Sequence, residues 1–526
     1  MNNRNTEKFI NTEYSEKYGN AYKAAVDSMI ETASPMELIN EKFNKNHLFL
    51  TTDSVELLVN QEQKRLDEFI EYSKKKNIIF VAKEHVESFF YPLVEEENPL
   101  LYRKEKRPLD NFVRSSQPEI EHDLKIVKDI TRKALSEGNC KNFVELFLNR
   151  YEKLSRMFRA KPSMRDFQSI TMIRKMKLKE SVKTVGMVSD CIVTRNNNII
   201  LTLEDGTDSI KVLLHNRNES LMEQARLILD DEVIGVTGVL GEDIVFANQL
   251  EFPDIPVGRE LNRSAEDICV AITSDLHVGS KNFTEAAFLR FIRWLNLKYS
   301  RKAELASKIQ YVIVAGDLVD GVGVYPGQED DLFITDMREQ YKKLVELLSL
   351  VPPHITLILL PGNHDATRIG EPQLPILEDY APDLYAMENV EMVGNPCFID
   401  LHSVKFLLYH GGSLFDFLAK QTQHDDASTP MVEMLKKRHL CPLYGNVPIV
   451  PLEEDLMVIE DVPDVFVTGH IHVNSHGSYR GTTVINPGCW MSQSEYQKTR
   501  NINPTPCKVP IFNLKTHNTT VMNFGA

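Results

Sequence analysis

The sequence predicts a multidomain α/β protein, with a helical module at the N-terminus, a small β-barrel, and a larger domain of layered sheets. Three observations support this fold class. The chain has 526 residues, which is too long for a single hydrophobic core. Residues 176–258 contain five short β-type runs around one helical run. Residues 265–526 alternate short apolar strands with helical segments.

Composition narrows the class of protein. Hydrophobic residues make up 42% of the chain and charged residues 26%, as in ordinary globular proteins. The net charge of −15 argues against a polybasic coat for DNA, although residues 151–180 hold nine Lys or Arg against three Asp or Glu. This basic stretch either follows DNA phosphates or forms a solvated helix that binds a partner.

The sequence does not support a membrane protein or a secreted protein. The opening residues, MNNRNTEKFI, lack the apolar region of a signal peptide, and no run approaches the ~18 apolar residues that cross a bilayer. Seven cysteines are dispersed without a C-x-x-C pair, which fits reduced thiols and argues against a zinc ribbon. We therefore expect a cytoplasmic protein that does not enter a membrane.

The sequence predicts helices and a charged linker in the N-terminal third of the chain. Residues 1–80 predict a helical module, in which Ser34, Pro35 and Glu37 form a capping box and residues 55–75 carry apolar positions at helical spacing. Residues 81–175 read as a charged linker followed by helices. In that region the proline-punctuated linker covers about 90–120, and helical signal returns over 121–160.

Residues 176–258 have the strand order of an OB-fold barrel. Three β-rich runs, in VKTVGMVSDCIVTRNNNIILTLEDGTDSIKVLLHN, precede a helical run and two further strands. OB barrels often bind single strands through exposed aromatic side chains, but the aromatic residues of this segment are only Phe246 and Phe252. The pattern favours a structural or protein-binding role over direct DNA binding, and both remain open.

Residues 265–526 place metal-capable side chains at the ends of apolar runs. The runs are DICVAITS, IQYVIVAG, HITLILLPG, VKFLLYHG, PDVFVTGH and TTVINPG. The polar residues that follow them are Asp275, His277, Asp317, Asn363, His364, His410, His470 and His472. Each alone is most simply a turn or helix cap, but ligands collect beyond strand ends in α/β domains, and so many together predict one metal site.

Carboxylate, imidazole and amide donors without Cys suit Mn²⁺, and Fe²⁺ or Zn²⁺ are alternatives. Two such ions can share a bridging carboxylate, activate water and neutralise the charge that builds on a phosphate. The competing interpretation is a relic site on a protein that only acts as a scaffold.

The motifs D-x-H, G-D, G-N-H-D, H and G-H-x-H, in this order over about 267–490, resemble those of the calcineurin-like metallophosphoesterase superfamily, whose domain is an αββα sandwich. The resemblance implies that one ion is held by Asp275, His277 and His472. It implies that the other is held by Asn363, His410 and His470. Asp317 would bridge the two ions, and His364 would stabilise the phosphate or protonate the leaving oxygen.

A narrower resemblance extends over nearly the whole chain in domain order. The segments DGVGVYPGQEDDL, PGNHDATRIGEPQ, HGGSLFD and NPGCWMSQSEYQ are similar to those of the small subunits of archaeal family D DNA polymerases. This resemblance implies a 3′–5′ exonuclease subunit for proofreading, in a heterodimer with a large catalytic subunit. It further implies contact with DNA, association with the nucleoid, and contact with a sliding clamp through the holoenzyme.

Two other functions stay open at this point. Eukaryotic B-subunits keep this fold but have lost most metal ligands, whereas here all seven ligand positions and His364 are intact, which favours an enzyme over a silent scaffold. A stand-alone phosphoesterase is disfavoured by the ~180 residues before the barrel, which a small-molecule hydrolase would not need.

Several further residues are candidates with an equally simple structural explanation. Arg368 either meets a substrate phosphate or forms a surface salt bridge. Asp320 and Asp365 either orient an imidazole or cap turns. Trp490 and Tyr496 either stack on an unpaired base or pack in the core. Four further histidines match no ligand pattern and are expected at the surface: His424, His439, His476 and His517.

Overall fold

The computed structural model describes residues 43, 49–50, 63–75, 80–81, 122–130, 136–299, 302–421, 426–494, 497–498 and 503–525. These residues belong to two units, which are Met1–Lys104 with Ala526, and Glu105–Gly525. In the first unit, helix α4 (Gln63–Lys75) lies within the expected helical run, and β1 (Phe49–Leu50) pairs in parallel with β2 (Phe80–Val81). The Ser34 capping box lies outside the described residues, so the helical module stays a prediction.

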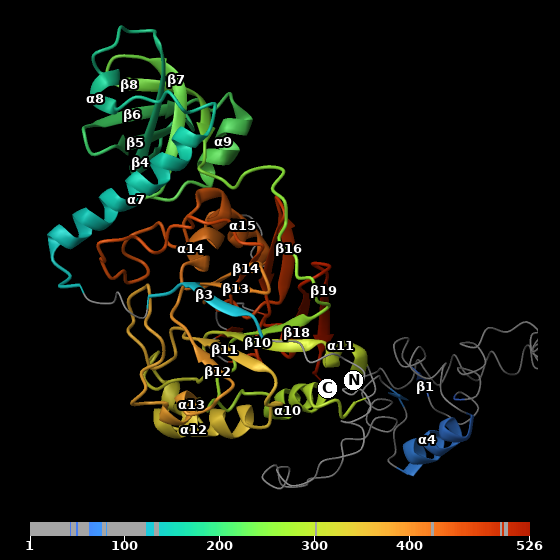
Figure 1. The fold of residues 1–526 in the computed structure, drawn as a ribbon. Coiled ribbons are helices and arrows are strands. Elements are labelled where there is room, and N and C mark those ends of the chain that lie inside the picture. The colour runs from blue at the N-terminus through green and yellow to red at the C-terminus, as the bar shows by residue number, and fades with distance from the viewer. Residues whose placement is uncertain are drawn as a thin grey trace, which may run out of the picture. The chain divides into compact units, whose positions relative to one another are not determined.

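Two six-stranded sheets form the centre of the second unit (Figure 1). The first sheet has the order β12-β11-β10-β9-β18-β19, formed by Val390–Met392, Thr356–Leu360, Ile309–Ala315, Cys269–Thr273, Lys508–Asn513 and Thr519–Asn523. The second has the order β16-β17-β15-β14-β13-β3, formed by Ser475–Tyr479, Thr482–Asn486, Val465–Val467, Val404–Leu408, Cys397–Leu401 and Leu124–Lys128. The six apolar runs quoted from the sequence correspond to β9, β10, β11, β14, β15 and β17.

Helices cover the outer face of each sheet and give a helix–sheet–sheet–helix sandwich. One core cluster lies between the sheets and joins side chains such as Ile313, Ile358, Phe406 and Val467. A second cluster packs the first sheet against α10 (Glu285–Leu295), α11 (Ala303–Ser307), α12 (Met337–Leu348) and α13 (Pro382–Tyr385). A third packs the second sheet against α14 (Leu414–Leu418) and α15 (Ser428–Lys437). Central strands β9, β10 and β11 are mostly apolar and almost fully buried because both of their faces are covered.

A closed five-stranded barrel lies in the chain between β3 and the other strands of the sandwich (green in Figure 1). Its strands are β4 (Ser181–Val193), β5 (Ile199–Glu204), β6 (Ser209–Leu214), β7 (Val233–Leu240) and β8 (Ile244–Glu251), and α9 (Glu219–Arg226) lies between β6 and β7. The expected order of three strands, a helix and two strands is therefore confirmed. The assignment of this barrel to the OB fold remains a prediction.

The segment before the barrel differs in part from the sequence expectation. Residues 121–160 are predicted to be helical, and α7 (Cys140–Ala160) is a helix whose start is fixed by a capping box between Asn139 and Asn142. However, residues 124–128 form the edge strand β3, which pairs antiparallel with β13. The sequence LKIVK is too short and too amphipathic to favour either a helix or a strand by itself. It forms a strand because it pairs with the free edge of β13. A short helix, α8 (Ile170–Ile173), follows, and the linker at 90–120 lies outside the described residues.

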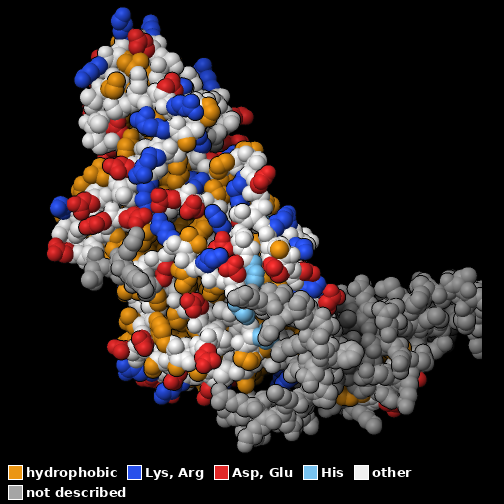
Figure 2. Space-filling model, in the orientation of Figure 1, with side chains coloured by type: hydrophobic (Ala, Val, Ile, Leu, Met, Phe, Trp, Pro, Cys, Tyr) orange, Lys and Arg blue, Asp and Glu red, His pale blue; other side chains and the backbone are white. Residues whose placement is uncertain are grey.

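On the face shown in Figure 2, Lys and Arg side chains are interspersed with Asp and Glu side chains. This mixture fits the acidic net charge of −15 better than a continuous basic coat. Within the described part of the chain, none of the helices has the length and apolar character needed to cross a bilayer.

Candidate metal centre

The eight expected site residues converge at one end of the sandwich, because the strands that precede them are parallel. Strands β9, β10 and β11 run parallel in one sheet, and β14 runs parallel to β15 in the other. The site residues follow the carboxyl ends of these five strands: Asp275 and His277 after β9, Asp317 after β10, Asn363 and His364 after β11, His410 after β14, and His470 and His472 after β15. The two sheets thus contribute to one polar cluster at the end of a hydrophobic core.

Five of the expected ligands have a left-handed backbone, which non-glycine residues rarely adopt. The φ values are 51° for Asp275, 52° for His277, 50° for Asp317, 70° for His470 and 59° for His472. Such backbone strain persists only where the surrounding structure enforces it, and it gathers at functional sites. The strain here turns each side chain inward directly after its strand.

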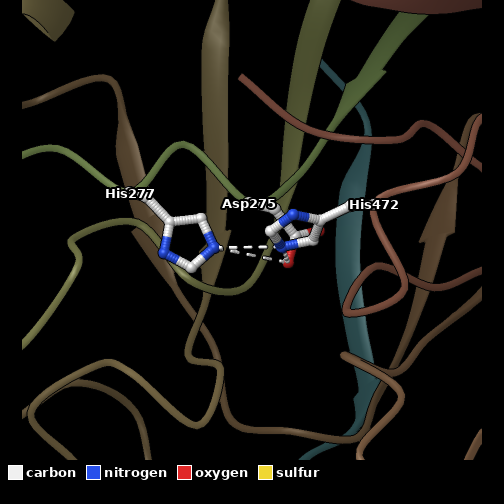
Figure 3. A group of neighbouring side chains, drawn as sticks. All are labelled: Asp275, His277 and His472. Carbon is white, nitrogen blue, oxygen red and sulfur yellow. Dashed lines mark hydrogen bonds and ion pairs between the residues drawn. The ribbon is translucent and has the colours of Figure 1, made fainter. Parts of the chain in front are cut away.

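Asp275, His277 and His472 form the first group of candidate ligands (Figure 3). The Nε2 atoms of the two imidazoles lie 3.1 Å apart. Asp275 Oδ1 lies 3.4 Å from His472 Nε2 and 4.0 Å from His277 Nε2. Three donor atoms from two sheets therefore face one small volume.

The second group is built around His410. Its Nε2 atom lies 3.0 Å from Asn363 Oδ1 and 3.4 Å from Asp317 Oδ2. The His470 ring packs edge-on against the His410 ring, with centroids 5.1 Å apart, and His470 belongs with Asp317 and His410 to one group of metal-capable donors. The backbone N–H of His470 also donates to the Asp275 carboxylate, which links the two groups.

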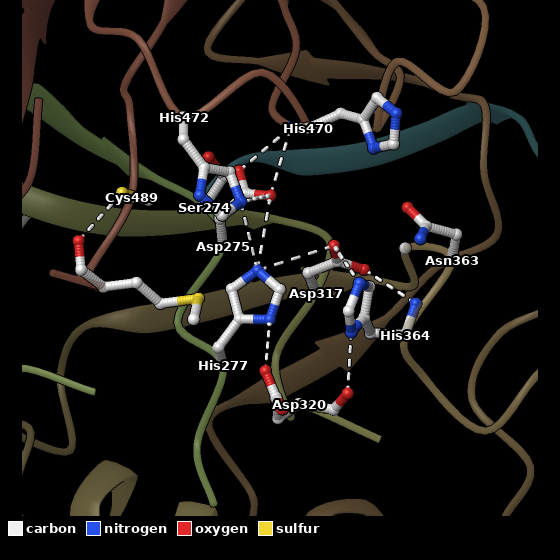
Figure 4. A network of polar contacts seen from close by, with 12 residues as sticks. Ser274, Asp275, His277, Asp317, Asp320, Asn363, His364, His470, His472 and Cys489 are labelled. Atoms are coloured by element: carbon white, nitrogen blue, oxygen red, sulfur yellow. Dashed lines mark hydrogen bonds and ion pairs between the residues drawn. The ribbon is translucent and has the colours of Figure 1, made fainter. Parts of the chain in front are cut away.

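Asp317 lies between the two groups (Figure 4). Its Oδ2 atom is 3.4 Å from His410 Nε2 and 3.7 Å from His277 Nε2, and its side chain is buried. Its Oδ1 atom accepts a hydrogen bond from the backbone N–H of His364 at 2.9 Å. A single carboxylate oxygen thus faces imidazole nitrogens of both groups, which gives Asp317 the geometry of a bridge.

The charged groups of the centre shift one another's pKa. Burial lowers the pKa of His410, but the Asp317 carboxylate outweighs it and raises that pKa to about 10. Burial raises the pKa of Asp317, but His410 and His364 outweigh it and hold that pKa well below its ordinary range. Burial, followed by the charge on His410, lowers the pKa of His470 to about 3. The buried carboxylates thus demand a positive charge, which a proton or a metal cation can supply.

The donor set fits divalent cations. The converging atoms are carboxylate oxygens, an amide oxygen and imidazole nitrogens, with no thiolate among them. His410 Nδ1 is 2.9 Å from the Ala315 carbonyl, and His277 Nδ1 is 3.0 Å from the Asp320 carboxylate. Each Nδ1–H is therefore placed to donate outward, so that Nε2, once deprotonated, points its lone pair into the cluster.

His364 lies on the solvent side of the cluster, together with the candidate ligands Asn363 and His470, which are also not fully buried. Its Nδ1 atom is 2.6 Å from the Asp320 carbonyl oxygen, while its Nε2 atom is 4.0 Å from Asp317 Oδ2. Its side chain is 15% exposed, against 3% for that of His277. The ring therefore lies at the edge of the cluster and can meet a group that approaches from solvent.

The comparisons with known proteins agree with one another. The family model for the DNA polymerase alpha/epsilon B-subunit matches residues 270–476. A DNA polymerase II small subunit from Methanothermobacter thermautotrophicus is 38% identical over 75% of this chain and 82% of its own length. The small subunit from Archaeoglobus fulgidus is 41% identical over 74% of this chain and 78% of its own length. The small subunit from Pyrococcus abyssi is 36% identical over 85% of this chain and 75% of its own length. This chain belongs to the archaeal DNA polymerase II small-subunit family.

All eight site residues of this family member fall inside the segment that the family model matches. The family resemblance stated from the sequence motifs is therefore confirmed. The names of the relatives identify a polymerase subunit and assign no role to individual residues.

Two carboxylates beside the cluster support it from outside. Asp365 accepts hydrogen bonds from the backbone N–H groups of Gly362 (2.9 Å), Leu318 (3.1 Å) and Val319 (3.3 Å), and from the Tyr341 hydroxyl (3.0 Å). It holds the turns after β10 and β11 together and is not a member of either ligand group. Asp320 faces His277 and accepts from the Gln328 amide at 3.1 Å, so it orients the imidazole.

Arg368 and Trp490 have partners within the chain. The Arg368 guanidinium donates to the Pro372 carbonyl, with Nε at 2.7 Å, so a role in binding substrate stays a prediction. The Trp490 side chain is buried and its Nε1–H donates to Thr273 Oγ1 at 2.5 Å, so its ring packs in the core and does not meet a nucleobase. Tyr496 and His424 lie outside the described residues.

Two residues were not found by sequence reasoning. The Gln497 amide lies 2.7 Å from His472 Nδ1 and fixes that ring, but a lone Gln 25 positions away gives no signal. His439 is expected at the surface, but it is buried, with Nε2 at 3.1 Å from Asp455 Oδ2. No local pattern predicts this, because Asp455 and the third partner of the cluster, Arg150, are brought to His439 only by the fold.

Proposed function

We propose that this small subunit is a metal-dependent 3′–5′ exonuclease that removes nucleotides from DNA ends for a replicative polymerase. The observation that carries the proposal is the convergence of the seven expected ligands and His364 in one cluster with Asp317 at its centre. A scaffold has no need for such an arrangement, because buried carboxylates and strained turns lower stability unless a cation compensates them.

The two groups of donors would hold two divalent ions. Asp275, His277 and His472 would bind one ion. Asn363, His410 and His470 would bind the other. Asp317 would bridge both. When bound, the ions would supply an activated water and neutralise the charge that develops on the scissile phosphate. Mn²⁺ suits these nitrogen and oxygen donors, and Fe²⁺ and Zn²⁺ are also compatible with them.

His364 would act on the leaving group. Its Nδ1–H is placed to donate to the Asp320 carbonyl, which fixes the ring and leaves Nε2 to carry the mobile proton. As the bond between phosphorus and the 3′-oxygen of the penultimate nucleotide breaks, protonated His364 would transfer that proton to the leaving oxygen. The products are a deoxynucleoside monophosphate and a DNA strand shortened by one nucleotide.

The relatives' names support a partner as well. They are called small subunits, so we infer that this chain forms a heterodimer with a large catalytic subunit and reaches the sliding clamp and the nucleoid through that holoenzyme. The closed barrel, assigned to the OB fold, would bind the partner subunit. Co-purification of a large polymerase subunit with the tagged full chain from native extract tests this inference, and a chain recovered alone at native expression level would contradict it.

Substitution of Asp317 by Asn tests the exonuclease. Asn tolerates the left-handed backbone at this position, so we expect the fold to persist while the bridging charge is lost. Degradation of a 3′-labelled single strand with Mn²⁺ should fall at least about 100-fold, because metal-assisted charge stabilisation contributes several kcal/mol. The exposed Asp379→Asn variant is the matched control and should keep full activity. Equal activity in the Asp317→Asn and wild-type proteins would contradict the assignment of Asp317 to the active site.

A further inference from the structure

An exposed aromatic ring lies beside the candidate metal centre without belonging to the core. Helix α14 begins four residues after His410, and its Leu414, Phe417 and Leu418 are buried in the cluster under the second sheet. Phe415 of the same helix is 43% exposed and is not a member of that cluster. Its ring packs edge-on against His470, with centroids 5.3 Å apart and an interplanar angle of 70°.

The helix that carries this ring is held firmly. The backbone N–H of Ser413 donates to the Tyr409 hydroxyl oxygen at 3.1 Å, and Ser413 Oγ donates to the Leu440 carbonyl at 2.5 Å. The Phe415 carbonyl accepts from the backbone N–H of Ala419 at 2.9 Å. Exposing an aromatic side chain to water is unfavourable. An exposed ring on a rigid helix can bind a flat apolar partner with little loss of side-chain entropy.

The two sides of the centre are not equivalent. His364 packs against His277, with centroids 4.7 Å apart, and faces Tyr325 at 6.5 Å, whereas Phe415 contacts His470 of the other ligand group. The proposed function puts the leaving 3′-oxygen, and with it the penultimate nucleoside, beside His364. On that placement the terminal nucleoside, on the other side of the scissile bond, would extend toward His470 and Phe415.

We propose that Phe415 stacks on the base of the 3′-terminal nucleotide and thereby selects unpaired or mismatched DNA ends. The inference rests on the proposed exonuclease and adds its substrate preference. A base can stack on Phe415 only after it leaves its partner in the duplex, which costs least when the terminal pair is mismatched or absent. Stacking of a base on an aromatic side chain tolerates every base, as proofreading requires.

Substrates with and without a terminal base test this role. The full chain, alone and with its large subunit, is assayed with Mn²⁺ on two single strands that differ only in the 3′-terminal nucleotide, one of which carries a tetrahydrofuran abasic residue. We expect wild-type kcat/KM to be about tenfold or more higher for the strand with the base. Phe415→Ala should lose this ratio by slowing only that strand, and Phe415→Trp should restore it. Tyr380→Ala removes a similarly exposed ring, which packs on Arg338 of α12, and should change neither rate.

The outcomes separate the two proposals. If wild-type protein cleaves neither strand with any divalent metal, the exonuclease itself is wrong, and the role of Phe415 in it falls as well. If wild-type protein cleaves both strands equally, or if Phe415→Ala slows both by the same factor, the exonuclease stands and the stacking role is overturned. A second readout needs no hydrolysis. In the Asp317→Asn protein, a 3′-terminal 5-iodouracil should photo-crosslink to the peptide that contains Phe415, and a crosslink elsewhere contradicts the proposal.

Discussion

At the scale of single residues, the turns with left-handed backbone and the buried histidines distinguish the candidate site from the rest of the fold. Left-handed backbone at Asp275, His277, Asp317, His470 and His472 costs about 1 kcal/mol each, so these turns lower stability while they direct side chains to a common point. Sequence reasoning found these residues because their types and order are distinctive. It missed His439, whose Asp455 partner is 16 positions away and reaches it through a turn that no short motif describes.

His439 makes a specific prediction about pH. Its Nδ1 accepts from the Cys441 backbone N–H at 3.1 Å, so Nε2 carries the proton toward Asp455 and no acceptor remains for a second proton. Burial, followed by the charge on Arg150, lowers the His439 pKa from 6.5 to about 4. Below pH 6.5 the unfolded chain therefore binds a proton on His439, whereas the folded chain binds it only near pH 4. The free energy of unfolding consequently falls by about 3 kcal/mol as the pH drops from 6.5 to about 4.

Urea unfolding of the wild-type and His439→Gln proteins between pH 4 and about 7 measures this loss. The variant should show a flatter dependence of the unfolding free energy on pH, and the exposed His476→Gln protein should follow the wild type. Parallel curves for all three proteins would show that His439 does not titrate in this way.

At the scale of elements, the sequence predicts best where apolar runs are long and continuous. All six quoted runs of the sandwich are strands, and the barrel has its expected strand order. The quoted runs do not include the interior strands β13 and β18 or the edge strands β3, β12, β16 and β19. The edge strands are hardest to predict, because short half-exposed strands take their conformation from the neighbour they pair with. The same limit explains why 124–128 was expected to be helical: its pairing partner, β13, lies about 270 residues further along the chain.

The turn after β11 supports a prediction at this scale. Gly362 packs so closely on the turn after β10 that an added Cβ would overlap the Asp317 carboxylate and its backbone nitrogen. Gly362→Ala must therefore displace Asp317, and a shift of about 1 Å at a reacting centre can cost about 100-fold in rate. We expect Mn²⁺-dependent hydrolysis to fall by about this factor, and the overpacking to lower the unfolding free energy by about 1–3 kcal/mol.

The matched control is Gly477→Ala in β16, where an added Cβ meets only ordinary contacts at 3.6 Å or more. Activity and bound metal, measured by mass spectrometry on the same preparations, should remain at wild-type levels in this control. If Gly362→Ala also keeps both, the close packing of the two turns does not position Asp317.

At the scale of the whole second unit, buried charges join the barrel, helix α7 and the sandwich. Arg150 of α7 is 1% exposed and donates to Asp455 Oδ2 at 2.8 Å, to the Pro442 carbonyl at 2.7 Å and to the Asp231 carbonyl at 3.2 Å. Asp231 precedes β7 of the barrel, whereas Pro442 and Asp455 follow α15 of the sandwich. Lys437 of α15 also pairs with Glu232 of the barrel. These contacts predict that the barrel and the sandwich unfold together.

Arg150→Met tests this coupling. The change keeps most of the side-chain volume but leaves the Asp455 carboxylate buried without its cation, which typically costs about 3–5 kcal/mol. We expect the denaturant midpoint to fall accordingly and the single transition to separate into two, because the barrel loses a buried charged link to the sandwich. Lys141→Met on the exposed face of the same helix is the control and should leave the midpoint within about 0.5 kcal/mol of wild type. In the double variant Arg150→Met/Asp455→Leu, part of the lost stability should return, since the unpaired charge is gone. A single transition with an unchanged midpoint in Arg150→Met would mean that Arg150 does not couple the two domains.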